Sequence, residues 1–100
     1  MPLFAVLLED EPKGASEIRR LHLSAHIEFL ERNATAIRSA GPLYDGAAGQ
    51  PAGGLWLVEA HSAEAVRILT QEDPFWPAGL RRSIRVLEWR RVFADGRRQK

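Results

Sequence analysis

Cysteine is absent from this chain of 100 residues, which excludes disulfide bonds, thiolate metal ligands and a cysteine nucleophile. Net charge is also nearly absent, because 14 lysines and arginines face 13 aspartates and glutamates, and this argues against a dedicated nucleic-acid-binding protein. No apolar run approaches the roughly 18 residues that a membrane span needs. Residues 1–4 lack the basic stretch and cleavage site of a signal peptide, so we expect a cytoplasmic protein that binds neither nucleic acid nor membrane.

Nucleotide-binding and serine-hydrolase motifs are missing as well. The sequence contains no Gly-x-Gly-x-x-Gly or Walker pattern and no serine-centred nucleophile elbow. Residues 45–54, rich in glycine, alanine and proline, predict a flexible loop rather than a phosphate cradle.

The hydrophobic pattern alternates between strands and helices. The predicted elements are strands at residues 3–8, 43–44, 55–60 and 83–93, and helices at residues 16–40 and 63–71. This order is that of the ferredoxin-like βαββαβ fold of the α+β class, an antiparallel sheet with two helices on one face. We expect a single domain at residues 1–94 and a basic, disordered tail at residues 95–100.

The predicted sheet has apolar side chains on both faces. Residues 3–8 are apolar at every position, and the strand at residues 83–93 also carries apolar residues on either side. Two helices cover only one face, and a chain this short has no further element for the other. We therefore predict a homodimer in which two sheets pack face to face, rather than a monomer with an exposed apolar face.

Histidine occupies a position of the first helix that should be apolar. His22, His26 and Asn33 project into the apolar sector, and His26 lies nearest its centre. The sector comprises Ile18, Leu23, Ile27, Phe29, Leu30, Ala34 and Ile37. An imidazole in such a place either has a hydrogen-bonding partner, such as a backbone carbonyl, or lines a cavity as a general acid or base. Helix position alone favours the buried structural histidine.

Two alternative binding sites are weaker. His22 and His26 have the i, i+4 spacing of a two-histidine metal site, but Leu23 stands where the zincin pattern has its glutamate, so we expect no metal. Five arginines near the last strand are split between two faces by strand alternation and predict a solvated edge, with one arginine left as a candidate for a substrate carboxylate. These arginines are Arg81, Arg82, Arg85, Arg90 and Arg91.

Three motifs in this order resemble the YCII-related family of the dimeric α+β barrel superfamily, which also holds muconolactone isomerases and small cofactor-free monooxygenases. They are the helix with its inward histidine, Ala-Gly-Pro-Leu at residues 40–43, and Asp-Pro-Phe at residues 73–75 followed by Ala-Gly-Leu at residues 78–80. The resemblance extends from Phe4 to Phe93.

The resemblance implies an active site built from a histidine and an aspartate. The histidine maps to His26, with His22 as the alternative, and the aspartate maps to Asp73. Without the resemblance, Asp73 is ordinary turn chemistry before a proline. Phe75 and Trp76 could form the wall of a pocket for a flat substrate or cover a sheet edge. His22 and Asn33 are further candidates for binding substrate, although Asn33 could equally satisfy a neighbouring backbone group.

The function implied is that of a small, cofactor-independent enzyme. A His–Asp pair suits elimination, isomerisation or a related proton transfer on a small carbonyl-bearing or phenolic substrate. In the family, one type of member removes HCl from a chlorinated hydroxyquinol. The alternative is a non-catalytic ligand-binding or regulatory module of the same fold. The distance between His26 and Asp73, and the presence of a cavity beside them, distinguish the two.

Overall fold

The computed structural model describes residues 1–47 and 49–99; Ala48 of the expected loop and Lys100 of the expected tail lie outside the described residues. The elements in chain order are β1 (Leu3–Asp10), α1 (Ala15–Arg32), β2 (Ile37–Tyr44), β3 (Pro51–Glu59), α2 (Ala63–Gln71), β4 (Arg81–Glu88), β5 (Phe93–Ala94) and β6 (Arg97–Arg98). The predicted βαββαβ order is confirmed for the first six. None of the helices in the described residues is long and apolar enough to cross a bilayer.

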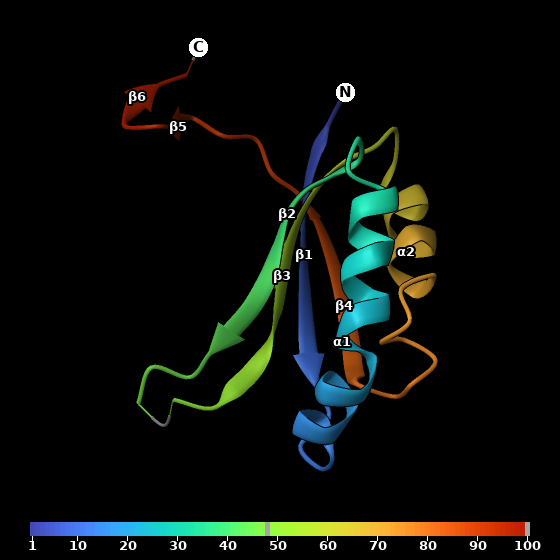
Figure 1. The fold of residues 1–100 in the computed structure, drawn as a ribbon. Helices are drawn as coiled ribbons and strands as arrows, with labels where there is room; N and C mark the ends of the chain where they lie inside the picture. Colours follow the sequence, from blue (N-terminus) through green and yellow to red (C-terminus); the bar gives the residue numbers. More distant parts are fainter. Residues whose placement is uncertain (48, 100) are drawn as a thin grey trace.

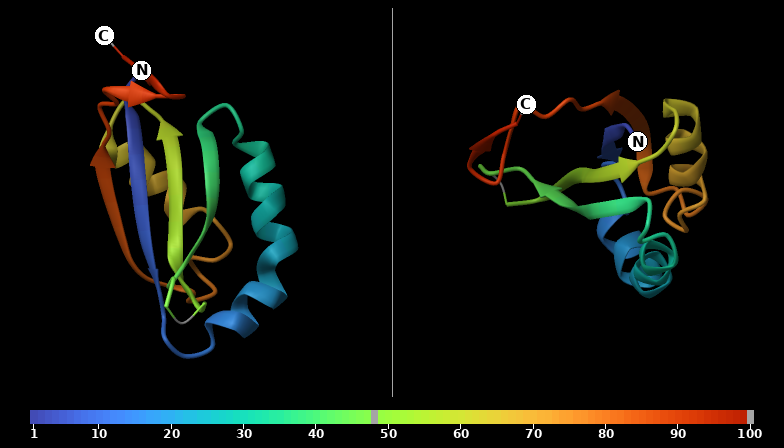
Figure 2. Two further views of the ribbon diagram at one scale, coloured as in Figure 1. Left: turned by 90° about the vertical axis from the view of Figure 1, so that its left-hand side faces the viewer. Right: turned by 90° about the horizontal axis from the view of Figure 1, so that it is seen from above.

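The first four strands form one antiparallel sheet in the order β2-β3-β1-β4, with both helices on one face (Figures 1 and 2). β1 lies in the interior of the sheet, where Val6 is opposite Trp56 on β3 and Val86 on β4. Between residues 3 and 8, the even-numbered side chains of β1 are buried beneath the helices, and the odd-numbered ones are half-buried on the other face. The buried core consists of Phe4, Val6, Leu8, Phe29, Ile37, Trp56, Val58 and Val66.

The first helix is shorter than predicted. It ends at Arg32 and not at residue 40, because Asn33 terminates it: the Asn33 backbone N–H donates to the Leu30 carbonyl and its side-chain amide donates to the Phe29 carbonyl. The prediction extended the helical period through apolar residues that belong to the following strand.

The second strand is correspondingly longer than the expected two residues. It starts at Ile37, which is buried in the core opposite Val58, and continues to Tyr44. Residues 40–43 therefore lie inside β2 and do not form a turn. Pro42 is tolerated because β2 is an edge strand, where a missing backbone N–H leaves no neighbour unpaired.

The glycine-rich segment that follows is partly strand. β3 begins at Pro51 and contains Gly53 and Gly54, both buried, which the sequence assigned to the loop. A Cβ on Gly53 would collide with the carbonyl oxygen of Leu8, and one on Gly54 would lie 3.2 Å from Nη1 of Arg81. Glycine is needed here because a backbone and a guanidinium approach the strand closely.

The last strand of the sheet ends earlier than predicted. β4 ends at Glu88, and the chain then leaves the body of the molecule and forms the β5–β6 hairpin on the side of the sheet opposite the helices (Figure 1). Asp95 and Gly96, at the start of the expected tail, form the turn of this hairpin, and their φ angles of 54° and 73° suit a two-residue turn.

A buried cluster of charges joins β1, α1 and β4. The Asp10 carboxylate accepts hydrogen bonds from Nη2 of Arg19 at 2.8 Å and from Nη1 of Arg81 at 2.9 Å, and Arg19 also donates to the Gly53 carbonyl. Only 4% of the Asp10 and Arg81 side chains is exposed. The prediction of a solvated strand edge is therefore wrong for Arg81, because the register of β4 places it opposite Asp10 on β1.

For Arg81, the nearby carboxylates do not fully offset the effect of burial on the charged guanidinium. Its pKa is lowered from the ordinary value, first because burial disfavours the charged form; Asp10 and Asp73 oppose this effect, and Arg19 adds to it. One carboxylate thus serves two guanidinium groups at this point of the fold, and both depend on it.

Replacing Asp10 tests this dependence. We expect Asp10→Asn to lower the free energy of unfolding by about 3–5 kcal/mol, because two guanidinium groups lose their shared counter-charge. Glu17→Gln is the matched control: it breaks the exposed pair with Arg20 and should cost at most about 1 kcal/mol. Urea denaturation of both variants measures the difference, and an Asp10→Asn protein as stable as the control would contradict the assignment.

Candidate active site

His26 and Asp73 meet in the interior, although 47 residues separate them. His26 projects from α1 toward the sheet, and Asp73 lies in the loop after α2. The distance between Nδ1 of His26 and Oδ1 of Asp73 is 2.8 Å, and the side chains are 10% and 3% exposed. The contact expected between these two residues is present, and His26 is the histidine that makes it.

Asp73 serves its own turn at the same time. Its Oδ1 also accepts the backbone N–H of Phe75 at 3.2 Å, two residues further on, past Pro74, which has no N–H to donate. The interpretation of Asp73 as turn chemistry and its interpretation as a partner of His26 therefore both describe the structure. The turn fixes the carboxylate in the position from which it binds the imidazole.

Aromatic rings hold the imidazole in place. Phe75 stacks on His26 with ring centroids 4.2 Å apart and an angle of 23° between the planes, and Trp56 lies at 6.2 Å. Within residues 1–47 and 49–99, Asp73 is the hydrogen-bonding partner of the His26 ring. An ionised carboxylate can only accept a hydrogen bond, so a neutral imidazole facing one carries its proton on Nδ1 and keeps a free lone pair on Nε2.

A pocket of about 460 Å³ opens beside this ring, between α1 and the sheet. α1, which carries His26, forms one wall and β2 the other, while Trp56 comes from β3, Phe75 from the loop after α2 and Arg81 from β4. Its lining consists of Ser16, Arg19, Arg20, Leu23, His26, Ile27, Leu30, Ala40, Gly41, Pro42, Tyr44, Trp56, Phe75 and Arg81. The Ala-Gly-Pro part of the 40–43 motif thus contributes directly to a pocket wall.

The other residues expected to bind substrate lie in different places. Phe75 lines the pocket, whereas His22, Asn33 and Trp76 do not belong to its lining. Asn33 is engaged at the end of α1, where its amide donates to the Phe29 carbonyl. The structure thus brings together His26, Asp73 and Phe75 among the residues singled out from the sequence.

The sequence analysis did not name Arg19 or Arg20 as site residues, and it left Arg81 only as one of five arginines of which one could bind a substrate carboxylate. Arg19, Arg20 and Arg81 all line it, and Arg81 and Arg19 lie 5.4 Å and 5.9 Å from the centroid of the Phe75 ring. The available signal was the Gly53-Gly54 pair, since two glycines inside a strand indicate a close approach by another group. No group of three or more histidines and carboxylates with metal-binding geometry occurs in the described part of the chain.

Comparison with known proteins agrees with the fold. A scan against protein-family models matches the YCII-related domain to residues 2–90. Among solved structures, the chain is similar to the 5-chloro-2-hydroxyhydroquinone dehydrochlorinase of Burkholderia phenoliruptrix AC1100, determined in complex with 2,5-dihydroxybenzoquinone. The two are 28% identical with a TM-score of 0.77, and the match covers 88% of this chain and 93% of the other. A search of the curated proteins found no match.

The family match spans the sheet and both helices, and the topology is that of the dimeric α+β barrel fold that the dehydrochlorinase also has. The chain belongs to the YCII-related domain family.

Proposed function

We propose that this protein is a small, cofactor-independent enzyme that transfers protons with His26 and Asp73, on a small phenolic or carbonyl-bearing substrate. One observation supports this above all others: a histidine held by a buried carboxylate at 2.8 Å lines a pocket of about 460 Å³. That volume is in the range of about 300–1,000 Å³ found for small-molecule sites.

The geometry suggests a division of roles. Asp73 accepts a hydrogen bond from the Nδ1–H of His26 and so keeps the lone pair of Nε2 available to the pocket. Nε2 then removes a proton from a carbon or hydroxyl of the substrate, and Asp73 stabilises the imidazolium that results. Such general base catalysis contributes about 10²–10⁴-fold to a rate. In an elimination, the electron pair released by the lost proton expels the leaving group, and His26 returns its proton to solvent.

The similarity to the dehydrochlorinase supports a substrate of this kind. That protein acts on a chlorinated hydroxyhydroquinone and was solved with a dihydroxybenzoquinone, both small planar rings. Trp56 and Phe75 supply flat apolar surfaces in the present pocket. His26 sealed in the core, with Asp73 turned to solvent, would have favoured a non-catalytic module of the same fold; the contact between the two side chains and the pocket beside His26 support the catalytic proposal instead.

We also propose that the protein works as a homodimer. On the face of the sheet without helices, one shallow and mostly apolar depression is lined by Ala5, Leu55, Leu57, Leu87 and Trp89, together with Glu88. Leu87 and Trp89 are 41% and 43% exposed in the single chain, and two such faces can pack about 10 Å apart. The His26 pocket is on the other side of the sheet, so this association leaves it open.

Replacing the histidine tests the catalytic role. We expect wild-type protein to release chloride from 5-chloro-2-hydroxyhydroquinone, and His26→Asn to reduce the rate by about 10²-fold or more because the base is lost. The control His22→Asn lies one turn earlier on α1 and outside the pocket, and should keep the wild-type rate. Circular dichroism verifies folding. Wild-type turnover by the His26 variant would remove the residue from the reaction, and a wild-type protein without chloride release would exclude dehydrochlorination.

A charge on the apolar sheet face tests the dimer. Light scattering of the purified protein should give twice the chain mass of 11.2 kDa, and Leu87→Glu should give the monomer because a carboxylate would be buried between the sheets. Leu21→Glu, at an exposed leucine of α1, should remain dimeric. A monomeric wild-type protein, or an unaffected Leu87 variant, would contradict the proposed interface.

A further inference from the structure

We propose that the pocket selects a planar small molecule that carries an ionised oxygen, a carboxylate or an acidic phenol, and that Arg81 binds this oxygen. The inference rests on the proposed function only in taking this pocket as the substrate site. It adds the charge of the ligand and the residue that recognises it.

The first observation is an incomplete set of hydrogen bonds on Arg81. Its Nη1 donates to Asp10, whereas Nε is buried without a partner among the described residues. An unsatisfied donor on a charged, buried group is costly, and native structures generally provide it with a ligand or a water. Nε lies on the edge of the guanidinium that forms paired, parallel hydrogen bonds with a carboxylate.

Arg19 provides the contrast within the same cluster. Its Nε and Nη2 both donate to Oδ2 of Asp10, and Nη2 donates in addition to the Gly53 carbonyl. Arg19 therefore uses its bidentate edge inside the protein. Arg81 contacts the other oxygen of the same carboxylate through Nη1 alone, so its bidentate edge is left over.

The second observation is the charge of the pocket lining. Three arginines line the pocket, and its lining contains no aspartate or glutamate. Asp10 and Asp73, which neutralise charge nearby, lie behind Arg81 and His26 and outside this lining. A ligand entering the pocket thus meets cationic and apolar groups, an arrangement that favours an anion over its neutral analogue.

The third observation is the position of Arg81 relative to His26. Both groups lie against the ring of Phe75, with the guanidinium carbon 5.4 Å and the imidazole centroid 4.2 Å from the ring centroid. Both residues also line the same pocket of about 460 Å³, so one small ligand that fills it can contact both. Its ionised oxygen on Arg81 would orient it, and a proton elsewhere on the conjugated frame would face His26. Negative charge released into that frame by proton removal would then be stabilised by the guanidinium.

Benzoate and its neutral isostere benzamide are the probes that test the charge preference. Titration followed by NMR should show benzoate binding about ten- to a hundredfold more tightly than benzamide, the range expected for hydrogen bonds to a charged group. Benzoate should also shift the ring resonances of His26 and Trp56, which line the pocket. This comparison uses the wild-type protein and needs no variant. Equal affinities, or binding that leaves both rings unchanged, would overturn the inference.

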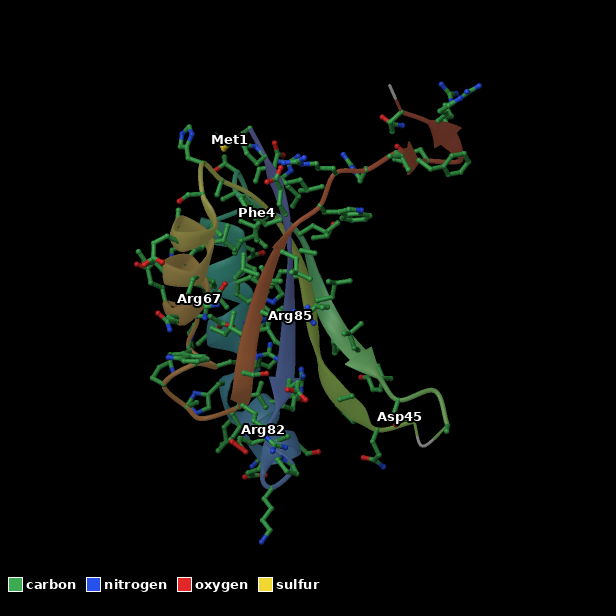
Figure 3. All side chains as sticks on the ribbon, turned by 180° about the vertical axis from the view of Figure 1, so that it is seen from behind. Met1, Phe4, Asp45, Arg67, Arg82 and Arg85 are labelled. Carbon is green, nitrogen blue, oxygen red and sulfur yellow. The ribbon has the colours of Figure 1, made fainter. Side chains whose placement is uncertain are left out.

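Substitutions assign the preference to Arg81. Arg81→Lys retains a charge but loses the bidentate edge, and should reduce the preference for benzoate by about tenfold. Arg85→Lys is the matched control, an exposed arginine midway along the same strand, and should change nothing (Figure 3). An undiminished preference in a folded Arg81→Lys protein would overturn the assignment.

The same titration separates this inference from the proposed catalysis. His26→Asn should keep the benzoate preference although it loses turnover. If His26→Asn still turns over substrate and also keeps the preference for benzoate over benzamide, the catalytic proposal alone is refuted. A wild-type enzyme that is active but binds benzamide as well as benzoate refutes the anion site alone.

Discussion

A carboxylate in an apolar interior needs donors on its oxygens, and the position of Asp73 follows from how it obtains them. Its Oδ1 accepts the Phe75 N–H from its own turn and the imidazole N–H of His26 from a helix that is 47 residues away in the chain. The first bond orients the carboxylate, and the second connects α1 to the loop after α2. The free nitrogen of the ring is left for the pocket because the other nitrogen is occupied. The hydrogen bond between His26 and Asp73 thus both connects two distant segments of the chain and orients the ring that lines the pocket.

Phe75 organises the groups around that bond. Its ring stacks on His26, and the guanidinium groups of Arg19 and Arg81 lie within 6 Å of its centroid. Asp10 balances the arginines from behind, as Asp73 does for the histidine. Two buried carboxylates therefore each support a basic group that lines the pocket. The glycines of β3 make this possible, because a side chain at Gly54 would displace the Arg81 guanidinium.

The parts of the fold that could be predicted are those whose signals are local. The apolar run of β1 and the capped stripe of α2 each appear within a few residues of sequence, and their order indicates the sheet topology. The end of α1 could not be predicted, since the helical spacing continues by chance into Ile37, which belongs to the core beside β3. The helix propensity of a short stretch of sequence carries no information about the pairing of Ile37 with Val58 on a distant strand.

The residues of the site also differ in whether their signal is local in the sequence or depends on long-range contacts. His26 was detectable because a polar ring in an apolar sector is a local anomaly, and Asp73 followed from the resemblance to a family. Arg81 could not be singled out among the five arginines of its region, because its burial depends on its register opposite Asp10, a contact between residues 71 positions apart. Strand alternation alone predicted an exposed edge for it. Long-range register, rather than composition, decides which of the arginines lines the pocket.

The protonation of the His26 ring tests the central claim most directly. Long-range ¹H–¹⁵N correlation spectra of ¹⁵N-labelled protein distinguish the two neutral tautomers of each histidine. We expect neutral His26 to carry its proton on Nδ1, with an Nε2 resonance that shifts when a ligand enters the pocket. A ring protonated on Nε2, with no response to any pocket ligand, would contradict the account.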